Sequence, residues 1–288
     1  MEEKRTITNT INRKALSVFL IFIIQLSIIQ VMAQQKSNRT PIVVAHRGAS
    51  AYAPENTLAA IKKAIEMGVD MIELDVQLSK DKQIVVMHDL SVDRTTNGKG
   101  RVRDLPFDEI RKLDAGSWFS SEFTGEKVPT LEEVIETVKG KCKLLIEVKR
   151  VKTPKPEIEA KIIQLIDKYN AYNWCIVQSF ETEVVKNIQA IDKSVECHKL
   201  VTMNISVLPL HLDSRIKTGT IYKYKTVQSI NPYFKMLNKR KVDKIHSRGQ
   251  KIITWTVNEK QDMKRMIEMG VDGIITNYPD RLIELLNK

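Results

Sequence analysis

From residue 41 onward, short apolar runs alternate along the chain with longer stretches in which apolar residues recur every three or four positions. The short runs predict buried strands, and the longer stretches predict amphipathic helices. Strands that alternate with helices of this length are typical of βαβ units and a parallel sheet. The predicted strands cover residues 42–45, 71–76, 143–148, 175–178, 197–201, 226–230, 252–257 and 273–276. The predicted helices cover residues 57–67, 131–138, 158–169, 181–191, 232–247 and 259–269.

Eight strands without a linker-like segment between them favour closure into a (β/α)8 TIM barrel, for which ~250 residues are typical. One place breaks the alternation: the polar segment 77–83 separates the second strand from another apolar run at 84–88. A parallel crossover needs about a dozen residues, so this run predicts the antiparallel return strand of a hairpin. A loop-rich segment, residues 90–128, follows it. The predicted fold class is therefore α/β, a TIM barrel with a small insertion, about residues 77–128, above the C-terminal rim after the second strand. Insertions at this face are where barrel enzymes set substrate specificity.

The N-terminal segment has the order of features that defines a secretory signal peptide. Four basic residues within the first 14 positions precede an apolar run from residue 15 to residue 33, and Val31 and Ala33 supply small residues for a cleavage site. The alternative is an uncleaved anchor helix, which the polar residues inside the run disfavour. We therefore predict a signal peptide at 1–33, a single barrel domain at 34–288, and export to the periplasm or the medium. No second apolar stretch approaches the ~20 residues of a membrane helix, so no stable membrane span is expected after cleavage.

The formal net charge of the chain is +11, which suits an anionic partner. The basic residues are spread along the helical stretches, and the densest run is only Lys239-Arg240-Lys241. A nucleic-acid-binding surface is more clustered and carries interleaved aromatic residues. The distribution therefore disfavours a nucleic acid as partner and favours a small anionic substrate.

Charged and imidazole side chains gather where the first three barrel strands are predicted to end. The C-terminal ends of barrel strands form the rim where active sites lie, and residues two apart on a strand share one face. Carboxylates on the inward face are costly to bury unless a cation compensates them, and their oxygens are ligands that Mg²⁺ and Ca²⁺ prefer. The residues with this placement are His46, Arg47, Glu73, Asp75, His88, Glu147 and Lys149.

Each of these features alone has a plainer interpretation. A Glu-x-Asp pair on a strand is more often a solvated or salt-bridged pair than a metal site, and Arg47 and Lys149 could simply neutralise the carboxylates. What favours a catalytic site is convergence at the predicted strand ends or on the hairpin above them, which is shared by His46, Glu73, Asp75, His88, Glu147 and Lys149.

The same residues carry a resemblance to the glycerophosphodiester phosphodiesterase family. His46-Arg47-Gly48, with Pro54-Glu55-Asn56-Thr57 just after it, resembles the opening motif of the family. Glu73-Leu74-Asp75-Val76 and Val86-Met87-His88-Asp89 resemble the second block. The later blocks follow in the order of the family: Pro129-Thr130-Leu131, Ile146-Glu147-Val148-Lys149, Gln178-Ser179-Phe180, Thr254-Trp255-Thr256-Val257-Asn258, and the stretch from Gly270 to Asn277 and Pro279. The ordered set, which runs from about residue 43 to residue 279, is far more specific than any single block.

The resemblance implies a TIM barrel with an insertion above the rim, in agreement with the hairpin predicted above. It also implies an enzyme that cleaves a glycerophosphodiester to glycerol 3-phosphate and an alcohol, with one divalent metal ion, Ca²⁺ or Mg²⁺. Carried over by position, the metal ligands are Glu73, Asp75 and Glu147. His46 and His88 are the acid–base pair, and the resemblance leaves open which of them is the acid.

The resemblance further implies that Arg47 and Lys149 contact the phosphate of the substrate. Phe180 and Trp255 are implied to line the pocket that receives the glycerol or the leaving alcohol. Other matched residues are expected to have structural roles. Asn56 or Thr57 is expected to cap a helix, and Glu55 is expected to brace Arg47. The insertion residue Arg94 and the Asn97-Gly98 turn are expected only to order the insertion.

Two other functions remain open at this point. Phospholipase D or lysophospholipase D action on lipids is a neighbouring chemistry on the same barrel, and the apolar segment 207–212 keeps it open. A non-catalytic phosphate-binding barrel is the other, although every implied catalytic histidine and carboxylate is present in this sequence. Residues 202–225 are expected to form an irregular loop that shapes specificity.

Overall fold

The computed structural model describes residues 40–149, 156–202 and 224–287. Within them, one sheet has the strand order β1-β9-β8-β7-β6-β5-β4-β2-β3 with a further pairing of β1 to β2. The pairing of β1 with both β2 and β9 is parallel, so eight parallel strands close into a barrel and β3 is added to β2 in antiparallel orientation. The predicted (β/α)8 TIM barrel is confirmed. The strands are β1 (Ile42–His46), β2 (Met71–Leu78), β3 (Ile84–Val86), β4 (Lys143–Val148), β5 (Cys175–Ser179), β6 (Glu196–Val201), β7 (Ser229–Pro232), β8 (Lys251–Thr254) and β9 (Gly273–Thr276).

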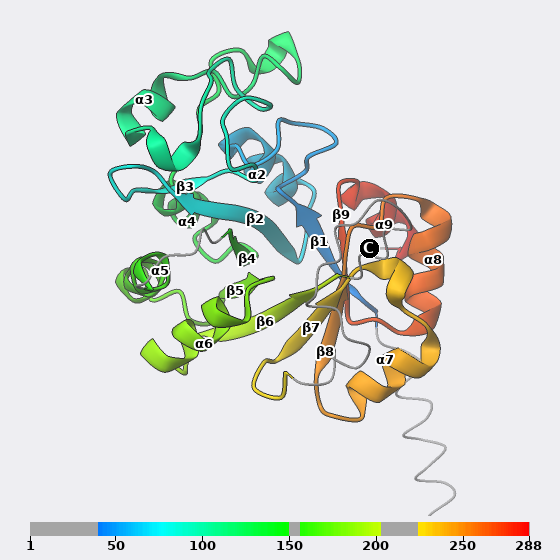
Figure 1. Ribbon diagram of the computed structural model, residues 1–288. Helices are drawn as coiled ribbons and strands as arrows, with labels where there is room; N and C mark the ends of the chain where they lie inside the picture. The colour runs from blue at the N-terminus through cyan, green and yellow to red at the C-terminus, as the bar shows by residue number, and fades with distance from the viewer. Residues whose placement is uncertain (1–39, 150–155, 203–223, 288) are drawn as a thin grey trace, which may run out of the picture. The chain divides into compact units, whose positions relative to one another are not determined.

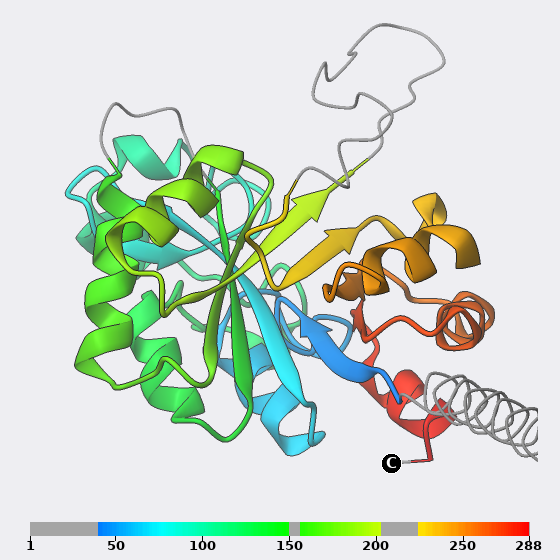
Figure 2. The same cartoon turned by 90° about the horizontal axis from the view of Figure 1, so that it is seen from below.

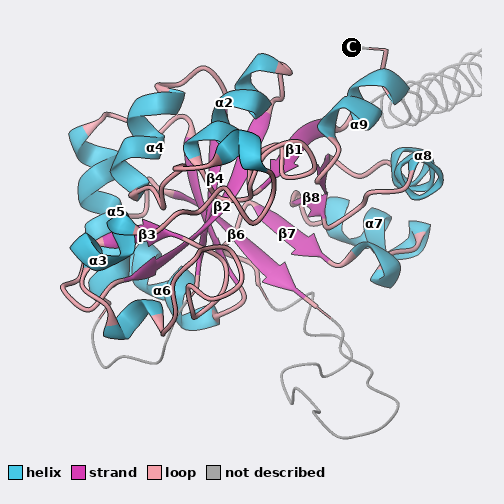
Figure 3. Cartoon of the chain, turned by 90° about the horizontal axis from the view of Figure 1, so that it is seen from above, coloured by secondary structure: helices cyan, strands magenta, loops and turns pink. Residues whose placement is uncertain are grey.

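Helices stand outside the strands in the two end-on views (Figure 2, Figure 3). All of these elements belong to one unit that begins at Pro41. The helices are α2 (Leu58–Glu66), α3 (Phe107–Lys112), α4 (Leu131–Val138), α5 (Glu157–Lys168), α6 (Thr182–Ile191), α7 (Lys239–His246), α8 (Lys260–Met269) and α9 (Pro279–Leu285).

Side chains alternate between the inside of the barrel and the layer beneath the helices, because successive residues of a strand point to opposite faces. The larger apolar cluster joins strand residues such as Ile72 and Leu74 to helix residues such as Ile61 and Ile135. A smaller cluster contains strand residues only and forms the apolar floor inside the barrel: Val44, Met71, Leu145, Ile176, Ile253 and Ile275. The residues two positions further along these strands are His46, Glu73, Glu147, Gln178, Trp255 and Asn277. The layer above the floor is therefore polar or aromatic, and it lies toward the carboxyl ends of the strands.

Helix ends follow the predicted signals. The Thr57 side chain caps α2 by accepting a hydrogen bond from the N–H of Ala60 at 3.3 Å. Thr130 and Glu133 form a capping box at the start of α4. Gly270 ends α8 with a left-handed φ of 76°.

The predicted hairpin is present, with Val76 opposite Val86 and Leu78 opposite Ile84. The segment after it is more ordered than expected, because it contains α3 and packs a small apolar core of its own above β3. This core consists of Val85, Met87, Val92, Val102, Ile110, Ala115 and Val128. In Figure 1 the insertion lies at one end of the barrel, with α3 beyond β3.

The prediction was wrong for the segment that follows the seventh strand. A helix was expected over residues 232–247, but Pro232 ends β7 and α7 begins only at Lys239, where the Asn238 side chain accepts a hydrogen bond from the N–H of Lys241. The strand predicted at 226–230 lies at Ser229–Pro232, and the one predicted at 252–257 ends at Thr254. Helix α9 was not predicted.

The predicted signal peptide, the apolar segment 207–212 and most of the expected loop 202–225 lie outside the described residues. Within the part of the chain that the structure describes, no helix is both long enough and apolar enough to cross a membrane.

Candidate active site

Three carboxylates meet at the carboxyl ends of two neighbouring strands. Glu73 and Asp75 lie on β2 and Glu147 lies on β4, where it is the register partner of Asp75. All three side chains are buried, and one oxygen of each lies within 4.8 Å of the others. The structure thus brings together the three residues predicted as metal ligands.

Burial opposes the ionisation of two of these three carboxylates. Burial, reinforced by Asp75 and Glu147, raises the pKa of Glu73 well above its usual range. Burial also raises the pKa of Glu147 to about 7. Burial alone would raise the pKa of Asp75 as well, but Lys149 and Arg47 outweigh it and lower that pKa. Carboxylates that resist ionisation in this way are stabilised by a bound cation, and three hard oxygen donors fit Ca²⁺ or Mg²⁺.

Two basic side chains border the trio. Lys149, at the end of β4, forms ion pairs with Asp75 at 3.0 Å and with Glu147. Arg47 Nη1 donates a hydrogen bond to Glu55 at 2.7 Å, as predicted. Its Nε lies 3.4 Å from an Asp75 oxygen but makes no hydrogen bond, although it is buried. This N–H is therefore ion-paired with Asp75 but has no hydrogen-bond acceptor among the described residues, so it can still donate to a ligand.

The backbone after β1 is shaped for this arrangement. Arg47 has a φ of 57°, in the left-handed region that ordinary residues seldom adopt. Its backbone N–H donates to a Glu73 oxygen at 3.1 Å, which fastens the loop to the trio. Gly48 follows with a φ of 80°, and a Cβ there would lie 2.6 Å from the backbone of Ala60 in α2. Only glycine allows the loop to pack this closely on α2.

His46 is held between the first and the last barrel strands. Its Nδ1 lies 2.6 Å from the amide oxygen of Asn277, just after β9, and its Nε2 lies 4.0 Å from Glu73. Burial and the nearby Arg47 charge lower its pKa to about 4. In the metal-free protein this imidazole is therefore neutral at pH 7.

His88 follows β3, on the hairpin above the rim. Its Nδ1 lies 2.7 Å from an Asp89 oxygen. A carboxylate only accepts hydrogen bonds, so Nδ1 carries the proton and Nε2 keeps its lone pair. Burial lowers the His88 pKa, as do the charges of Lys149 and Arg47, although Asp75 opposes them.

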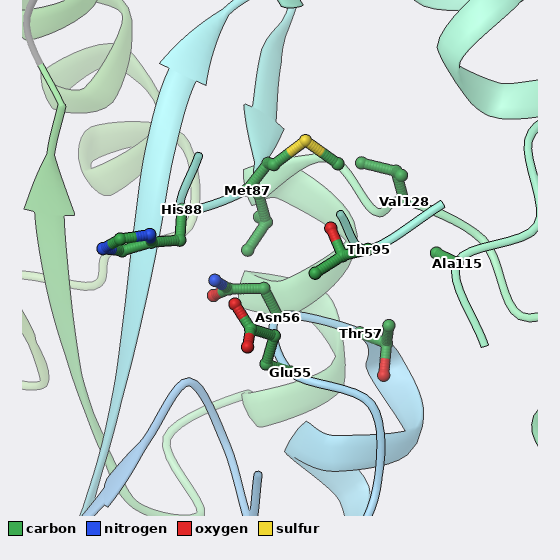
Figure 4. Close-up of a pocket in the computed structure, with 9 residues that line it drawn as sticks. Glu55, Asn56, Thr57, Met87, His88, Thr95, Ala115 and Val128 are labelled. Atoms are coloured by element: carbon green, nitrogen blue, oxygen red, sulfur yellow. The ribbon is translucent and has the colours of Figure 1, made fainter. Parts of the chain in front are cut away.

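A small pocket, partly open to solvent, lies beside His88 and is lined from both the loop after β1 and the insertion. Figure 4 shows the Glu55 carboxylate and the Asn56 amide on the side of this pocket that faces His88. The insertion contributes Thr95, Ala115 and Val128 to its wall. The pocket is therefore bounded by both the barrel and the insertion.

The two predicted pocket aromatics also lie together. The rings of Phe180 and Trp255 meet edge to face, with centroids 5.4 Å apart. Tyr233, which the sequence did not single out, extends the cluster at 5.5 Å from Trp255. The Trp255 Nε1 donates to the backbone oxygen of Asn231 at 2.8 Å, which fixes the indole.

Three amides contact the site without having been predicted to do so. Asn56 has a φ of 60° and donates to Asp75 at 2.9 Å, while Thr57 alone caps α2. Gln178 reaches Glu73 at 3.4 Å, and Asn277 holds His46. Gln178 and Asn277 each come two positions after a residue of the apolar floor, Ile176 or Ile275. This two-residue spacing is the sequence signal that could have predicted their place at the site. Asn56 has no such signal, because its contact depends on the left-handed turn.

The (β/α)8 barrel has a buried carboxylate trio with two bordering cations, and two histidines lie at or above its C-terminal rim. These features together define a class of barrel hydrolases. Comparison with known proteins narrows the class. The model of the glycerophosphoryl diester phosphodiesterase family matches residues 46–281. The chain belongs to this family.

Individual relatives agree with the family match. The chain is 42% identical over 248 residues to a glycerophosphodiester phosphodiesterase of Caldanaerobacter subterraneus subsp. tengcongensis, with 86% of this chain and 98% of that protein covered. It is 35% identical to a glycerophosphodiester phosphodiesterase of Bacillus subtilis, with 92% and 94% covered. An Oleispira antarctica phosphodiesterase, solved with the product sn-glycerol-3-phosphate, superposes with a TM-score of 0.75 at 27% identity, with 86% of this chain and 98% of that chain covered.

Proposed function

We propose that this chain hydrolyses glycerophosphodiesters to glycerol 3-phosphate and an alcohol. The observation that carries the proposal is the buried trio of Glu73, Asp75 and Glu147 with two cations beside it, Arg47 and Lys149. The names of the relatives and the product bound to the Oleispira enzyme support the substrate class.

Glu73, Asp75 and Glu147 would hold one divalent ion, Ca²⁺ or Mg²⁺. When bound, the ion would offset the negative charge of the phosphodiester and polarise a phosphoryl oxygen. The raised pKa values of Glu73 and Glu147 support this proposal, because both carboxylates gain from a nearby cation. Asn56 supports the ligand set by fixing both the backbone N–H and one oxygen of Asp75.

Arg47 and Lys149 would bind the phosphoryl oxygens and stabilise the charge that develops on them. The Nη1 of Arg47 already donates to Glu55, whereas its buried Nε–H has no hydrogen-bond acceptor among the described residues and can donate to the substrate. Lys149 remains cationic, because Asp75 and Glu147 outweigh its burial and raise its pKa.

One of His46 and His88 would take a proton from the attacking group, water or a hydroxyl of the substrate, and the other would give a proton to the leaving alkoxide. Each such transfer typically contributes ~10²–10⁴-fold to the rate. The lowered pKa values favour the neutral form of both rings at pH 7. Each ring has its Nδ1 within hydrogen-bond distance of a neighbour, Asn277 or Asp89, which leaves Nε2 for the reaction. Phe180 and Trp255 would line the pocket for the glycerol or the leaving alcohol. Export through the signal peptide at residues 1–33 is part of the same proposal.

The test is an assay of purified protein with glycerophosphocholine and glycerophosphoethanolamine, coupled to detection of glycerol 3-phosphate. EDTA is compared with added Ca²⁺ or Mg²⁺, and wild type with His46→Ala, Glu73→Ala and the exposed control Glu66→Gln. Metal-dependent release that the first two substitutions abolish and the control preserves supports the proposal. Absence of release from every glycerophosphodiester with either metal refutes it, and lysophospholipids would then be the substrates to test.

A further inference from the structure

Arg94, in the insertion, makes hydrogen bonds to two carboxylates at once. Its Nη1 and Nη2 donate to the two oxygens of Glu55 at 3.0 and 2.7 Å. Its Nε and Nη2 donate to the two oxygens of Asp89 at 2.6 and 3.2 Å. Four of the five guanidinium N–H groups are used in this way, in two bidentate contacts that fix the orientation of both carboxylates.

Both carboxylates also hold residues of the proposed site. Asp89 bonds to His88 Nδ1 at 2.7 Å, and Glu55 accepts from Arg47 at 2.7 Å. Glu55 belongs to the loop that follows β1 in the barrel, whereas His88 and Asp89 follow β3 on the hairpin. Arg94 therefore joins the His88–Asp89 pair to the barrel.

The insertion does not depend on Arg94 for its own structure. It has its own apolar core, and its loops are closed by other bonds, such as Thr96 Oγ1 to the Val92 oxygen at 2.7 Å. Asp93 accepts from the N–H of Gly100 at 2.9 Å, and the N–H of Asp114 donates to Asn97 at 2.9 Å. The hydrogen bonds of the Arg94 guanidinium, in contrast, go to Glu55 and Asp89 at the site. This direction argues against a role that is confined to ordering the insertion.

We propose that Arg94 is a positioning residue for catalysis, which orients the His88 ring through Asp89 and anchors it to the barrel through Glu55. The proposal rests on the proposed function, because that function gives His88 its role in proton transfer. The Arg94 side chain is 44% exposed, so solvent screens the contribution of its ion pairs to global stability. The effect of Arg94 is therefore expected in the geometry of His88 and in turnover, with only a small effect on global stability.

The first test compares Arg94→Gln and Arg94→Lys with Arg103→Gln. Arg103 is a matched control, because it lies in the same insertion, is similarly exposed and, among the residues that the structure describes, forms an ion pair only with its neighbour Asp104 at 3.7 Å. We expect kcat of Arg94→Gln to fall about 10- to 100-fold with a smaller change in KM, since misplaced catalytic groups cost up to ~10²-fold. Lysine keeps the positive charge but cannot make the bidentate hydrogen bonds of a guanidinium, so Arg94→Lys is expected to recover only part of the lost kcat. Arg103→Gln is expected to stay within about twofold of wild type.

The second test is independent of turnover. Long-range ¹H–¹⁵N spectra of substrate-free protein report the tautomer of each histidine, and His88→Ala assigns the His88 signals. Wild type is expected to show His88 protonated at Nδ1, and Arg94→Gln is expected to move its two nitrogen shifts toward the values of a tautomer mixture. Asp89→Asn is the positive control, and the Arg94→Gln/Asp89→Asn double variant should add little, because both act through one bond network.

A changed His88 spectrum together with a reduced kcat supports the proposal. An unchanged His88 spectrum in Arg94→Gln overturns it, even if kcat falls. If wild type proves inactive on every glycerophosphodiester, the proposed function fails, yet the spectrum still decides whether Arg94 orients His88. If Arg94→Gln does not fold, the same spectrum of Arg94→Lys decides, since that variant keeps the charge.

Discussion

The imidazole of His46 is held by the amide of Asn277, 231 positions later in the chain and 2.6 Å away. His46 ends β1 and Asn277 follows β9, the two strands whose pairing closes the barrel. Asn277 is itself fixed, because its backbone N–H donates to the side chain of Asn258 at 3.0 Å. Closure of the barrel therefore orients a proposed catalytic residue at the same time as it completes the fold.

Replacing Asn277 should change the protonation of His46. An aspartate at this position would place a negative charge beside Nδ1 and favour the imidazolium form, so the His46 pKa should rise from about 4 toward its ordinary value. NMR titration of Asn277→Asp in EDTA measures this, with Asn277→Leu as the uncharged comparison. A pKa that is equally low in both variants would contradict the role assigned to the amide. In the assay, Asn277→Leu is expected to lower kcat about tenfold through loss of ring orientation.

Binding of Ca²⁺ or Mg²⁺ should stabilise the wild-type protein against unfolding. A ligand that binds only the folded state adds about 2.7 kcal/mol at a concentration one hundred times its Kd. Thermal unfolding in EDTA and at increasing metal concentration measures the gain. Glu73→Gln removes one ligand and part of the charge repulsion, so it should lose most of the metal-induced rise in Tm without a lower Tm in EDTA. Glu66→Gln, on the exposed side of α2, should respond to metal as wild type does.

The Glu147 carboxyl should make metal-free protein less stable as the pH rises. Its pKa is raised from 4.5 to about 7 by burial, so the folded state binds more protons than the unfolded state between these values. The protonated carboxyl makes its full contribution to the free energy of unfolding below about pH 4.5. As the pH rises through about 7, this contribution falls by up to ~3 kcal/mol. His46 has the opposite effect over part of this range, because its pKa is lowered. The measurement is therefore the difference in unfolding free energy between wild type and Glu147→Gln in EDTA. A difference that does not change between pH 4.5 and 7.5 would show that Glu147 ionises normally.

The regular parts of the fold could be predicted because each strand and helix carries its own hydrophobic period. The positions of Glu73, Asp75 and Glu147 followed from the same period, since residues two apart on a parallel strand share the inner face of the barrel. The start of α7 could not be predicted in this way, because its apolar pattern continues upstream across β7 and the turn that Asn238 caps.

The contacts that the sequence did not indicate depend on pairings between distant segments. Asn56 was expected to cap a helix, and its contact with Asp75 exists only because the loop turns through a left-handed residue. Arg94 was expected only to order the insertion, and its two carboxylate partners come from separate segments that meet above the rim. Hydrophobic periodicity describes which face a residue occupies, but it contains no information about which loops meet.

Gly48 and Gly68 offer a matched test of the packing beneath the site. Both have left-handed φ values, 80° and 72°, so alanine is strained at either position. A Cβ at Gly68 meets no atom within 4 Å, whereas at Gly48 it would lie 2.6 to 2.8 Å from the backbone and Cβ of Ala60. Gly68→Ala should therefore cost about 1 kcal/mol in unfolding free energy, and Gly48→Ala should cost at least ~1–3 kcal/mol more through overpacking. Because the loop at Gly48 also carries Arg47, the folded fraction of Gly48→Ala should lose substrate affinity while that of Gly68→Ala does not. Chemical denaturation and KM measured on both variants check this, and equal stabilities would mean that α2 can shift to accept the added methyl group.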